Sequence, residues 1–250
     1  MTLTLTPLPH IPLVKAGDDI AELILTALER AGLPLQDGDI LVLAQKIVSK
    51  SEGRLVNLTQ VVPSQRALEL AEQVEKDARL IELILQESKS ILRTRPGTII
   101  VEHRLGFVCA NAGIDQSNVS GEDLVLLLPE NPDASASALR KRLEEISAAR
   151  LGVLIIDSHG RAWRMGVAGT TIGLSGLPGL VDLRGNQDLF GYTLRVTQVG
   201  AADELAAAAS LVMGQAAEGV PVVHVRGFPY ELCESRLDEI LRPQGQDLFR

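Results

Sequence analysis

The order of helix-like and strand-like segments is the feature that most constrains the fold of this chain. Short apolar runs typical of buried strands lie at residues 40–44, 151–156 and 220–225. Amphipathic runs typical of helices lie at residues 18–31 and 135–149. The two kinds of segment do not alternate regularly, as they would in a doubly wound parallel sheet. The sequence therefore predicts a mixed α+β fold that is not a Rossmann fold.

Two further regions carry helical patterns, and a third alternates like a strand. The charged region 64–86 predicts two helices with a break near residues 76–77. The alanine-rich region 201–213 predicts another helix, and the alternation over residues 192–199 indicates a strand.

The composition is that of a chain with a substantial aliphatic core. Of its 250 residues, 46% are apolar and 3% are aromatic, so the core must be built from Leu, Val, Ile and Ala. This length suits one large domain or two small interlocked ones. Because no linker-like stretch interrupts the sequence, we expect a single unit over residues 1–250, with an inserted subdomain at about residues 85–190.

Charge and cysteine usage exclude several classes of function. The net charge of −8 argues against nucleic acid or an anionic membrane as a partner. Cys109 and Cys233 form no spaced pair, so neither a disulfide framework nor a zinc site is expected. The sequence shows no signal peptide and no apolar run of the roughly 18 residues that a membrane span needs. We therefore expect a cytoplasmic protein.

The segment 108–119 is the richest in groups that could bind a ligand. It follows an apolar, strand-like run and combines amide, hydroxyl and carboxylate side chains with a glycine, namely Asn111, Gly113, Asp115, Gln116, Ser117 and Asn118. Glycine and asparagine tolerate unusual backbone angles, and Asp and Asn supply hard oxygen ligands. The segment therefore predicts a site for a metal ion, a phosphate group, or both.

Asp115 and Asp157 form the strongest pair of candidate metal ligands. Each follows an apolar run, where side chains converge at the open end of a sheet. With neutral oxygens from Ser158 and Asn118 they make a reasonable ligand set for Mg²⁺ or Mn²⁺. The alternative is that both aspartates serve turns or helix caps. His159 is close to Asp157 in the sequence and is a further candidate neighbour of the site.

Basic residues at two places could meet an anion. Lys46 and Lys50 follow a strand directly and could contact phosphate oxygens, or they could form a solvated surface pair. Arg161 and Arg164 straddle Trp163 and could bind an anionic group, or they could simply be exposed. The sequence contains no P-loop and no Rossmann glycine motif.

Taken in order, five motifs of this chain closely resemble the coenzyme F-420-0:L-glutamate ligase (gamma-glutamyl ligase) family. The resemblance runs from about residue 10 to residue 228. Any one motif is weak, but five in the right order are specific. They lie at residues 11–19, 38–54, 111–119, 157–161 and 211–214.

The resemblance implies an activity. Members of the family use GTP and a divalent metal, Mg²⁺ or Mn²⁺, with K⁺ as a further cation, to join L-glutamate to the deazaflavin precursor F-420-0. Many add further gamma-linked glutamates. Phosphorylation of the terminal carboxylate by GTP would give it a good leaving group, and the glutamate amine would then attack the acyl phosphate.

The resemblance also implies site residues and an assembly. The nucleotide-binding positions are Ile11, Pro12, Leu13 and Val14, which resemble a nucleotide-contacting strand, and Gln45, Lys46, Lys50, Asn118, Gly214 and Gln215. The metal-ligand positions are Asp115, Asp157, Ser158 and Gln215, and the catalytic positions are Asp115, Asp157 and Lys50. Two interlocked α/β subdomains in an intertwined homodimer are expected.

Two departures from the family pattern concern the loop after residue 213. Gln215 stands where relatives often have an acid, and a neutral amide is a weaker metal ligand than a carboxylate. Ala216 and Ala217 stand where relatives often have glycine. Some bacterial relatives carry a second, flavin-reductase-like domain, which is not expected here.

Two other functions use the same residues. A divalent-metal-dependent phosphotransferase or hydrolase acting on another substrate would need the same carboxylates. A non-catalytic nucleotide-binding module would bind GTP without turnover.

Overall fold

A computed structural model describes residues 2–118 and 121–248. Val119, the last residue of the segment 108–119, and the terminal residues 1, 249 and 250 of the expected unit lie outside the described residues. In chain order the elements are β1 (Thr4–Pro7), α1 (Ile20–Ala31), β2 (Ile40–Ala44), α2 (Gln45–Ser51), β3 (Leu55–Asn57), η1 (Leu58–Gln60), α3 (Gln65–Val74), α4 (Ala78–Gln86), β4 (Ser88–Arg95), β5 (Thr98–His103), β6 (Val108–Ala110), η2 (Asn111–Gly113), β7 (Leu124–Leu126), α5 (Pro132–Ser147), β8 (Gly152–Arg161), β9 (Arg164–Ser175), β10 (Val181–Asp182), β11 (Gln198–Val199), α6 (Ala201–Met213), β12 (Val222–Arg226), η3 (Leu237–Glu239) and η4 (Gln244–Gln246).

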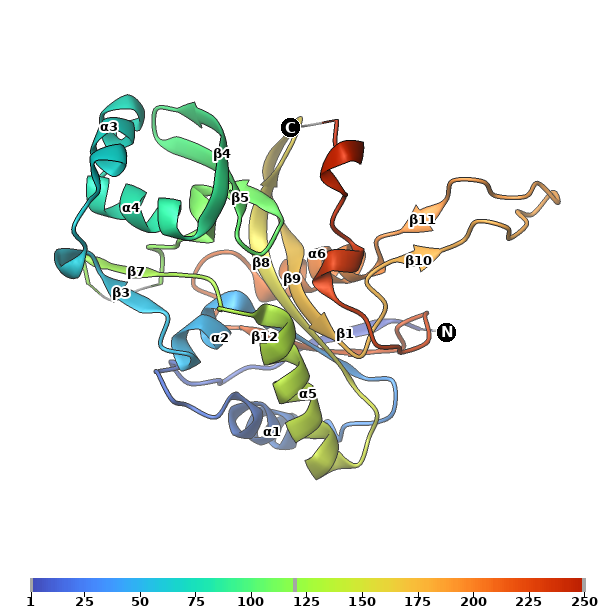
Figure 1. Cartoon of the computed structure of the whole chain (residues 1–250). Helices are drawn as coiled ribbons and strands as arrows, with labels where there is room; N and C mark the ends of the chain where they lie inside the picture. Colours follow the sequence, from blue (N-terminus) through green and yellow to red (C-terminus); the bar gives the residue numbers. More distant parts are fainter. Residues whose placement is uncertain (1, 119–120, 249–250) are drawn as a thin grey trace.

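The central sheet has five strands in the order β1-β12-β2-β8-β9. Strands β2 and β8 are parallel, and the other neighbours in this sheet are antiparallel. Helix α6 lies on one face of the sheet, and α5 with α1 lies on the other (Figure 1). Strand β2 and the first part of β8 are almost continuously apolar because both faces of these strands are covered. The mixed α+β prediction is therefore confirmed.

Local capping groups explain where the first helix begins and ends. The Asp19 carboxylate accepts hydrogen bonds from the backbone N–H groups of Ala21 and Glu22, which are otherwise unpaired at the start of α1. Gly32 ends the helix in the left-handed conformation, with φ = 63°. The helix ends where the predicted run 18–31 ends, and it begins two residues after the start of that run.

A second group of elements packs beside the central sheet. It contains the antiparallel sheet β4-β5-β6, the helices α3 and α4, and the pair β3–β7 (Figure 1). The predicted break between the two helices is confirmed: α3 ends at the left-handed residue Glu75, and Asp77 caps α4. Strand β6 packs against β8, which joins this group to the central sheet.

Two sequence predictions about strands were wrong in extent. Strand β8 does not end at residue 156 but continues through residue 161, because the glycine-rich stretch after it forms β9 and pairs with it. Residues 192–199 were expected to form one strand, but they contain only the short strand β11 and an isolated antiparallel bridge between Thr193 and Gln187. The residues between β10 and β11 instead form an arm that projects from the molecule (Figure 1).

Among residues 2–118 and 121–248, no helix is long and apolar enough to cross a bilayer.

Candidate active site

The candidate site residues lie at the carboxyl end of the parallel pair β2–β8. The last paired residues are Ala44 and Ile156, after which the chain continues as α2 on one side and as Asp157 on the other. Ligands in sheets with parallel strands commonly bind at this edge. Asp157 was expected to follow a strand, but it lies inside β8, at the point where β8 becomes accessible beyond its buried part.

Lys46, on α2, makes the first set of contacts with the segment 115–118. Its Nζ lies 2.6 Å from Asp115 Oδ2 and donates a 2.7 Å hydrogen bond to the Ser117 hydroxyl. That hydroxyl donates to Asp115 Oδ1 at 2.8 Å, and the Ser117 backbone N–H donates to the same oxygen at 2.7 Å. Lys50 Nζ donates to the Asn118 carbonyl at 2.9 Å. Residues about seventy positions apart therefore form one cluster.

Charge interactions in this cluster shift two pKa values. Burial would raise the pKa of Asp115, but hydrogen bonds and the charge of Lys46, together with the Ser117 donors, hold it below its ordinary value. Burial and repulsion by Lys46 lower the pKa of Lys50, and the Asp115 charge opposes them. The cluster therefore keeps an anionic carboxylate between two lysines at neutral pH.

The backbone that leads to Asp115 is tightly turned. Asn111 and Ala112 have φ values of 51° and 52°, in the left-handed region, and Gly113 has a φ of 66°. A Cβ at Gly113 would lie 2.7 Å from Leu128 Cδ1, so a side chain is excluded there. For alanine this conformation is strained and persists because the surrounding structure fixes it. The unusual backbone angles that Asn and Gly tolerate are therefore present at Asn111 and Gly113 of the segment 108–119.

Asp157 and Ser158 make a second set of contacts. Asp157 Oδ2 lies 3.1 Å from Nε2 of His159, which confirms that His159 is a neighbour of this residue. The Ser158 hydroxyl donates to Gln215 Oε1 at 2.8 Å, and Gln215 Nε2 donates to the Ser210 hydroxyl at 2.8 Å. Ser158 and Gln215 are thus brought together, and the loop after α6 is attached to β8.

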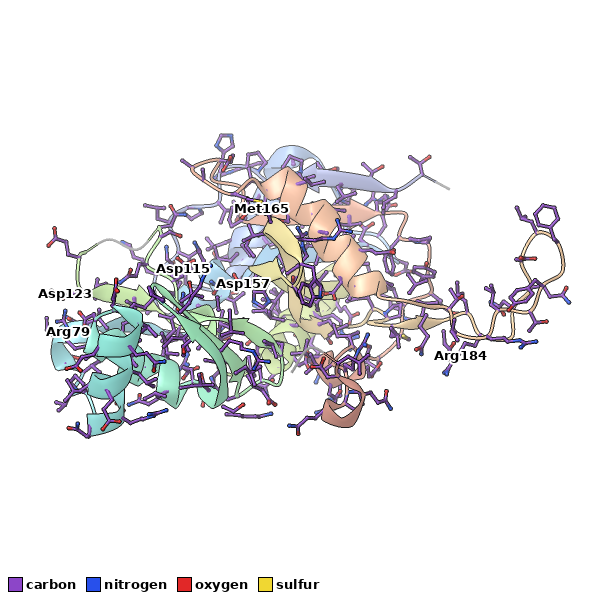
Figure 2. The ribbon with its side chains drawn as sticks, turned by 90° about the horizontal axis from the view of Figure 1, so that it is seen from above. Arg79, Asp115, Asp123, Asp157, Met165 and Arg184 are labelled. Carbon is purple, nitrogen blue, oxygen red and sulfur yellow. The ribbon has the colours of Figure 1, made fainter. Side chains whose placement is uncertain are left out.

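Cys109 connects the two sets of contacts. It lies on β6, which leads through η2 to Asp115, and β6 packs against β8. Burial together with the nearby charge of Asp157 raises the pKa of the Cys109 thiol to about 12. Figure 2 shows Asp115 and Asp157 in the same region of the molecule, Asp157 on the β8–β9 hairpin.

The oxygen donors of the site fit a divalent metal that arrives with a phosphate. Asp115, Asp157, Ser158 and Gln215 offer carboxylate, hydroxyl and amide oxygens, which are the ligands of Mg²⁺ and Mn²⁺. Within the described residues, no three Asp, Glu, His or Cys side chains gather as a ready ligand set. Mg²⁺ commonly takes one or two carboxylates and completes its shell with water and substrate phosphates, so this donor set is compatible with it.

The remaining candidate positions lie in irregular segments. The segment Ile11 to Val14 was expected to be a strand, but it has no regular secondary structure. Val14 is buried and Ile11 is partly buried against the core, so these two side chains anchor the segment, whereas Leu13 is 88% exposed. Gly17 N–H donates to the Ser51 carbonyl at 2.8 Å, which fixes the end of this segment to α2.

Sequence reasoning missed Ser210 as a site residue and named Ser117 only as one of several polar groups in the segment 108–119. Ser117 contacts both Lys46 and Asp115, and Ser210 positions Gln215. Isolated serines carry no sequence signal for such roles. Gly214 has a φ of 75°, and a Cβ there would lie 2.2 Å from the Glu218 carboxyl carbon, so glycine is required at the start of this loop.

The comparisons with known proteins agree on one family. The F420-0:gamma-glutamyl ligase family matches residues 9–227 of the chain. A protein named Coenzyme F420:L-glutamate ligase from Methanothermobacter thermautotrophicus is 48% identical over 252 residues, covering all of both chains. Proteins of the same name from Methanopyrus kandleri and Archaeoglobus fulgidus are 47% and 42% identical, covering all of this chain and 98% and 97% of theirs.

A lysine- and carboxylate-rich site at the end of a parallel strand pair suits an enzyme that handles phosphate groups, and the matched family consists of ligases. The class of protein is therefore an enzyme of the ligase type. The chain belongs to the F420-0:gamma-glutamyl ligase family.

Proposed function

We propose that this enzyme is a GTP-dependent ligase that joins L-glutamate to F-420-0 and can add further gamma-linked glutamates. The observation that carries the proposal is the full-length similarity to proteins named Coenzyme F420:L-glutamate ligase, 48% identical in the case of Methanothermobacter thermautotrophicus. The Lys46–Asp115 cluster supports it, because it offers cations for phosphate oxygens beside hard oxygen ligands.

In the proposed reaction, the γ-phosphoryl group of GTP passes to the terminal carboxylate of F-420-0, and GDP leaves. The amine of L-glutamate then attacks the acyl phosphate carbon, inorganic phosphate leaves, and the amine loses a proton as the amide forms. A carboxylate alone is a poor acylating agent, which is why the phosphorylation step is needed. Positioning and charge neutralisation are what a protein contributes to such a transfer.

The lysines on α2 are proposed to bind the nucleotide phosphates. Lys46 and Lys50 lie on one helix at the edge of the sheet, and the Asn118 carbonyl fixes Lys50. Gln45 is buried at the start of α2, and the Ile11 to Val14 segment and the Gly214–Gln215 loop complete the proposed nucleotide contacts. GTP would replace part of the internal pairing that Lys46 now makes with Asp115.

Asp115, Asp157, Ser158 and Gln215 are the residues that would hold Mg²⁺ or Mn²⁺, with K⁺ proposed as a further cation. The divalent ion would offset negative charge on the phosphoryl group during its transfer. Ser117 keeps the Asp115 carboxylate oriented through two hydrogen bonds, and Gln215 keeps Ser158 in place.

The proposal is tested by incubating the enzyme with F-420-0, GTP, L-glutamate and Mn²⁺ or Mg²⁺, followed by mass analysis. We expect a mass increase of one or more glutamyl groups and formation of GDP. No increase under conditions where a control ligase is active would sink the proposal. GTP consumption that is unaffected by F-420-0 and glutamate would instead indicate a phosphotransferase or hydrolase.

We also propose that the enzyme is a homodimer. The arm formed by residues 183–197 projects from the molecule, and four of its apolar side chains are exposed, namely Leu189, Phe190, Tyr192 and Val196. Contiguous exposed apolar side chains of this size are typical of protein–protein interfaces. A second copy of the chain is the proposed partner.

A further inference from the structure

A pocket outside the Lys46–Asp115 cluster has the shape and chemistry of a ligand site. Its volume is about 520 Å³, within the range of small-molecule sites. Its apolar wall includes Leu92, Ile100 and Val108, from the sheet β4-β5-β6. Gly160 and the turn between β8 and β9 form the opposite side, and a Cβ at Gly160 would meet nothing within 4 Å, so this side is open.

Three arginines surround this apolar wall. They are Arg93 from β4, Arg161 from β8 and Arg164 from β9. Within the described part of the chain, none of the three forms an ion pair with a carboxylate. Asp247 also lines the pocket, but the guanidinium groups outnumber it. In a chain with a net charge of −8, this is a local basic patch that would attract an anion.

The pocket is adjacent to the candidate active site. Cys109 lies on the pocket wall, and the charge of Asp157 reaches its thiol. Gly160 is three residues beyond Asp157 on the same strand, a span of about 10 Å in a β-strand. A ligand in the pocket with a flexible chain could therefore place the end of that chain beside Asp157.

We propose that this pocket binds the acceptor substrate, as a planar, largely apolar ring system that carries an anionic chain. The ring lies against Leu92, Ile100 and Val108, and the arginines contact the anionic chain. The end of the chain, which carries the carboxylate to be activated, points toward Asp157. This inference rests on the proposed function, since it assigns the binding site of the deazaflavin substrate.

Trp163 provides a direct readout of binding. It is the chain's one tryptophan, and it lies in the turn between Arg161 and Arg164. Titration of the wild-type enzyme with F-420-0, without GTP or glutamate, is expected to change the Trp163 fluorescence in a saturable way. The dissociation constant, rather than the amplitude, is compared among variants, because nearby substitutions alter the tryptophan emission itself.

The test variant is the double substitution Arg161→Gln and Arg164→Gln, and the matched control is Arg30→Gln, an exposed arginine on α1. We expect the double variant to weaken F-420-0 binding at least about tenfold, because two charge-assisted hydrogen bonds are lost. The control should bind like the wild type. A second variant, Val108→Phe, narrows the pocket from the exposed edge of β6, should weaken binding without altering charge, and leaves Trp163 as the one tryptophan.

Steady-state kinetics show whether the pocket binds F-420-0 or the nucleotide. The double variant should raise the KM for F-420-0 and leave the KM for GTP within about twofold of the wild type. An unchanged dissociation constant for F-420-0 in both the double variant and Val108→Phe overturns the inference. A rise in the KM for GTP alone also overturns it, because the pocket would then belong to the nucleotide.

Failure of the proposed function is distinguishable from failure of this inference. If the wild type forms no glutamyl product, the proposed function fails. The fluorescence titration still tests whether the pocket binds F-420-0. Binding of F-420-0 that the arginine substitutions weaken supports the inference, and absence of F-420-0 binding to the wild type overturns it.

Discussion

Asp115 and Asp157 lie in different electrostatic surroundings although both are candidate metal ligands. Asp115 is held by Lys46 and by both Ser117 donors, whereas Asp157 has the imidazole of His159 beside it. A metal ion at Asp115 would therefore compete with a lysine, which suits an ion that enters together with an anionic nucleotide. At Asp157 the competition is with an imidazole.

Replacing either aspartate should abolish turnover and leave the fold intact. We expect Asp115→Asn and Asp157→Asn each to lower kcat at least about 100-fold. The proposed metal ion offsets charge on the phosphoryl group during transfer, and each substitution removes one of its charged ligands. The far-ultraviolet circular dichroism spectrum should not change, since both side chains are partly accessible. The measurement is glutamyl product formation by mass analysis. Asp238→Asn, at an exposed aspartate, is the control.

Wild-type turnover in both variants would refute the metal assignment.

At the residue scale, the sequence singled out the charged residues Lys46, Lys50 and Asp115, and the structure brings them together in one cluster. The roles of the two lysines in binding nucleotide and of Asp115 in binding a metal stay predictions. Ser117 was left without a role, because a serine becomes informative only when the fold places a lysine and a carboxylate on either side of it. The assignments of Asp157, Ser158 and Gln215 as metal ligands stay predictions as well.

At the scale of elements, a buried ionic group ties the central strands together. The Asp39 carboxylate is buried at the start of β2 and accepts two hydrogen bonds from Arg226, at 2.8 and 2.7 Å. His224 Nε2 lies 2.9 Å from the same carboxylate. Burial would raise the pKa of Asp39, but Arg226 and His224 hold it well below its usual range. His224 therefore has a structural role in β12.

Asp39→Asn should destabilise the protein strongly. Removing one charge from a buried pair costs about 3–5 kcal/mol, because Arg226 and His224 lose their partner. For a chain of this size we expect the melting temperature to fall by roughly 10 °C. Thermal unfolding followed by circular dichroism checks this, with Asp238→Asn again as the control. A fall of less than about 2 °C would show that the group contributes little.

The low pKa of Glu87 predicts that the protein loses stability in acid. Burial would raise this pKa, but His103, Arg104 and Arg54 lower it to about 2, with Arg54 and Arg104 within 3.0 and 2.9 Å. A carboxyl whose pKa is lower in the folded state stabilises the fold above its ordinary pKa of about 4.5 and loses this contribution as the pH falls toward 2. The contribution is roughly 3 kcal/mol at most.

Urea unfolding at pH 7 and at pH 3 measures this contribution. The wild type should lose free energy of unfolding between the two pH values. Glu87→Gln should be less stable at pH 7 and should lose less than the wild type on acidification. Equal pH dependence of the two proteins would show that other carboxyl groups dominate acid unfolding.

Two glycines on the β8–β9 hairpin should differ sharply in their tolerance of a methyl group. A Cβ at Gly169 would lie 2.4 Å from the Ala206 carbonyl oxygen on α6, whereas a Cβ at Gly160 would meet nothing within 4 Å. We expect Gly169→Ala to cost about 1–3 kcal/mol through overpacking and Gly160→Ala to cost much less. The comparison uses melting temperatures, and equal values for the two variants would contradict the close packing of α6 on β9.

The sequence predicted elements whose boundaries depend on nearby residues. It did not predict elements whose structure depends on contacts with distant parts of the chain. The boundaries of α1 follow from Asp19 and Gly32, which act within a few residues. The glycine-rich strand β9 gave no strand signal, because its glycines serve close approaches of α6 at Gly169 and of α5 at Gly173. Such contacts depend on the tertiary fold and leave no periodic pattern.

At the scale of the whole molecule, the arm at residues 183–197 exposes apolar side chains that have no packing partner within the core of the described chain. The alternation over residues 192–199 predicted a strand, but only Gln198–Val199 form one. Leu189 and Phe190, in the turn of the arm, are 98% and 95% exposed. The turn is well ordered locally, since Asp188 accepts hydrogen bonds from the backbone N–H groups of Phe190 and Tyr192. An ordered arm that presents apolar side chains to solvent is what an interface element looks like before assembly.

Charges at the end of the arm should dissociate the proposed dimer. Burying a Leu and a Phe contributes about 1.5–3 kcal/mol each, so Leu189→Asp with Phe190→Asp should raise the dimer dissociation constant at least about 100-fold. Each subunit should keep its melting cooperativity, because neither side chain packs into its own core. Analytical ultracentrifugation over a concentration series measures the constant. Val62→Asp, at an apolar side chain that is 86% exposed elsewhere on the surface, is the matched control. A wild type that sediments as a monomer at all concentrations, or a double variant that dimerises as tightly as the wild type, would mean that the arm serves another purpose.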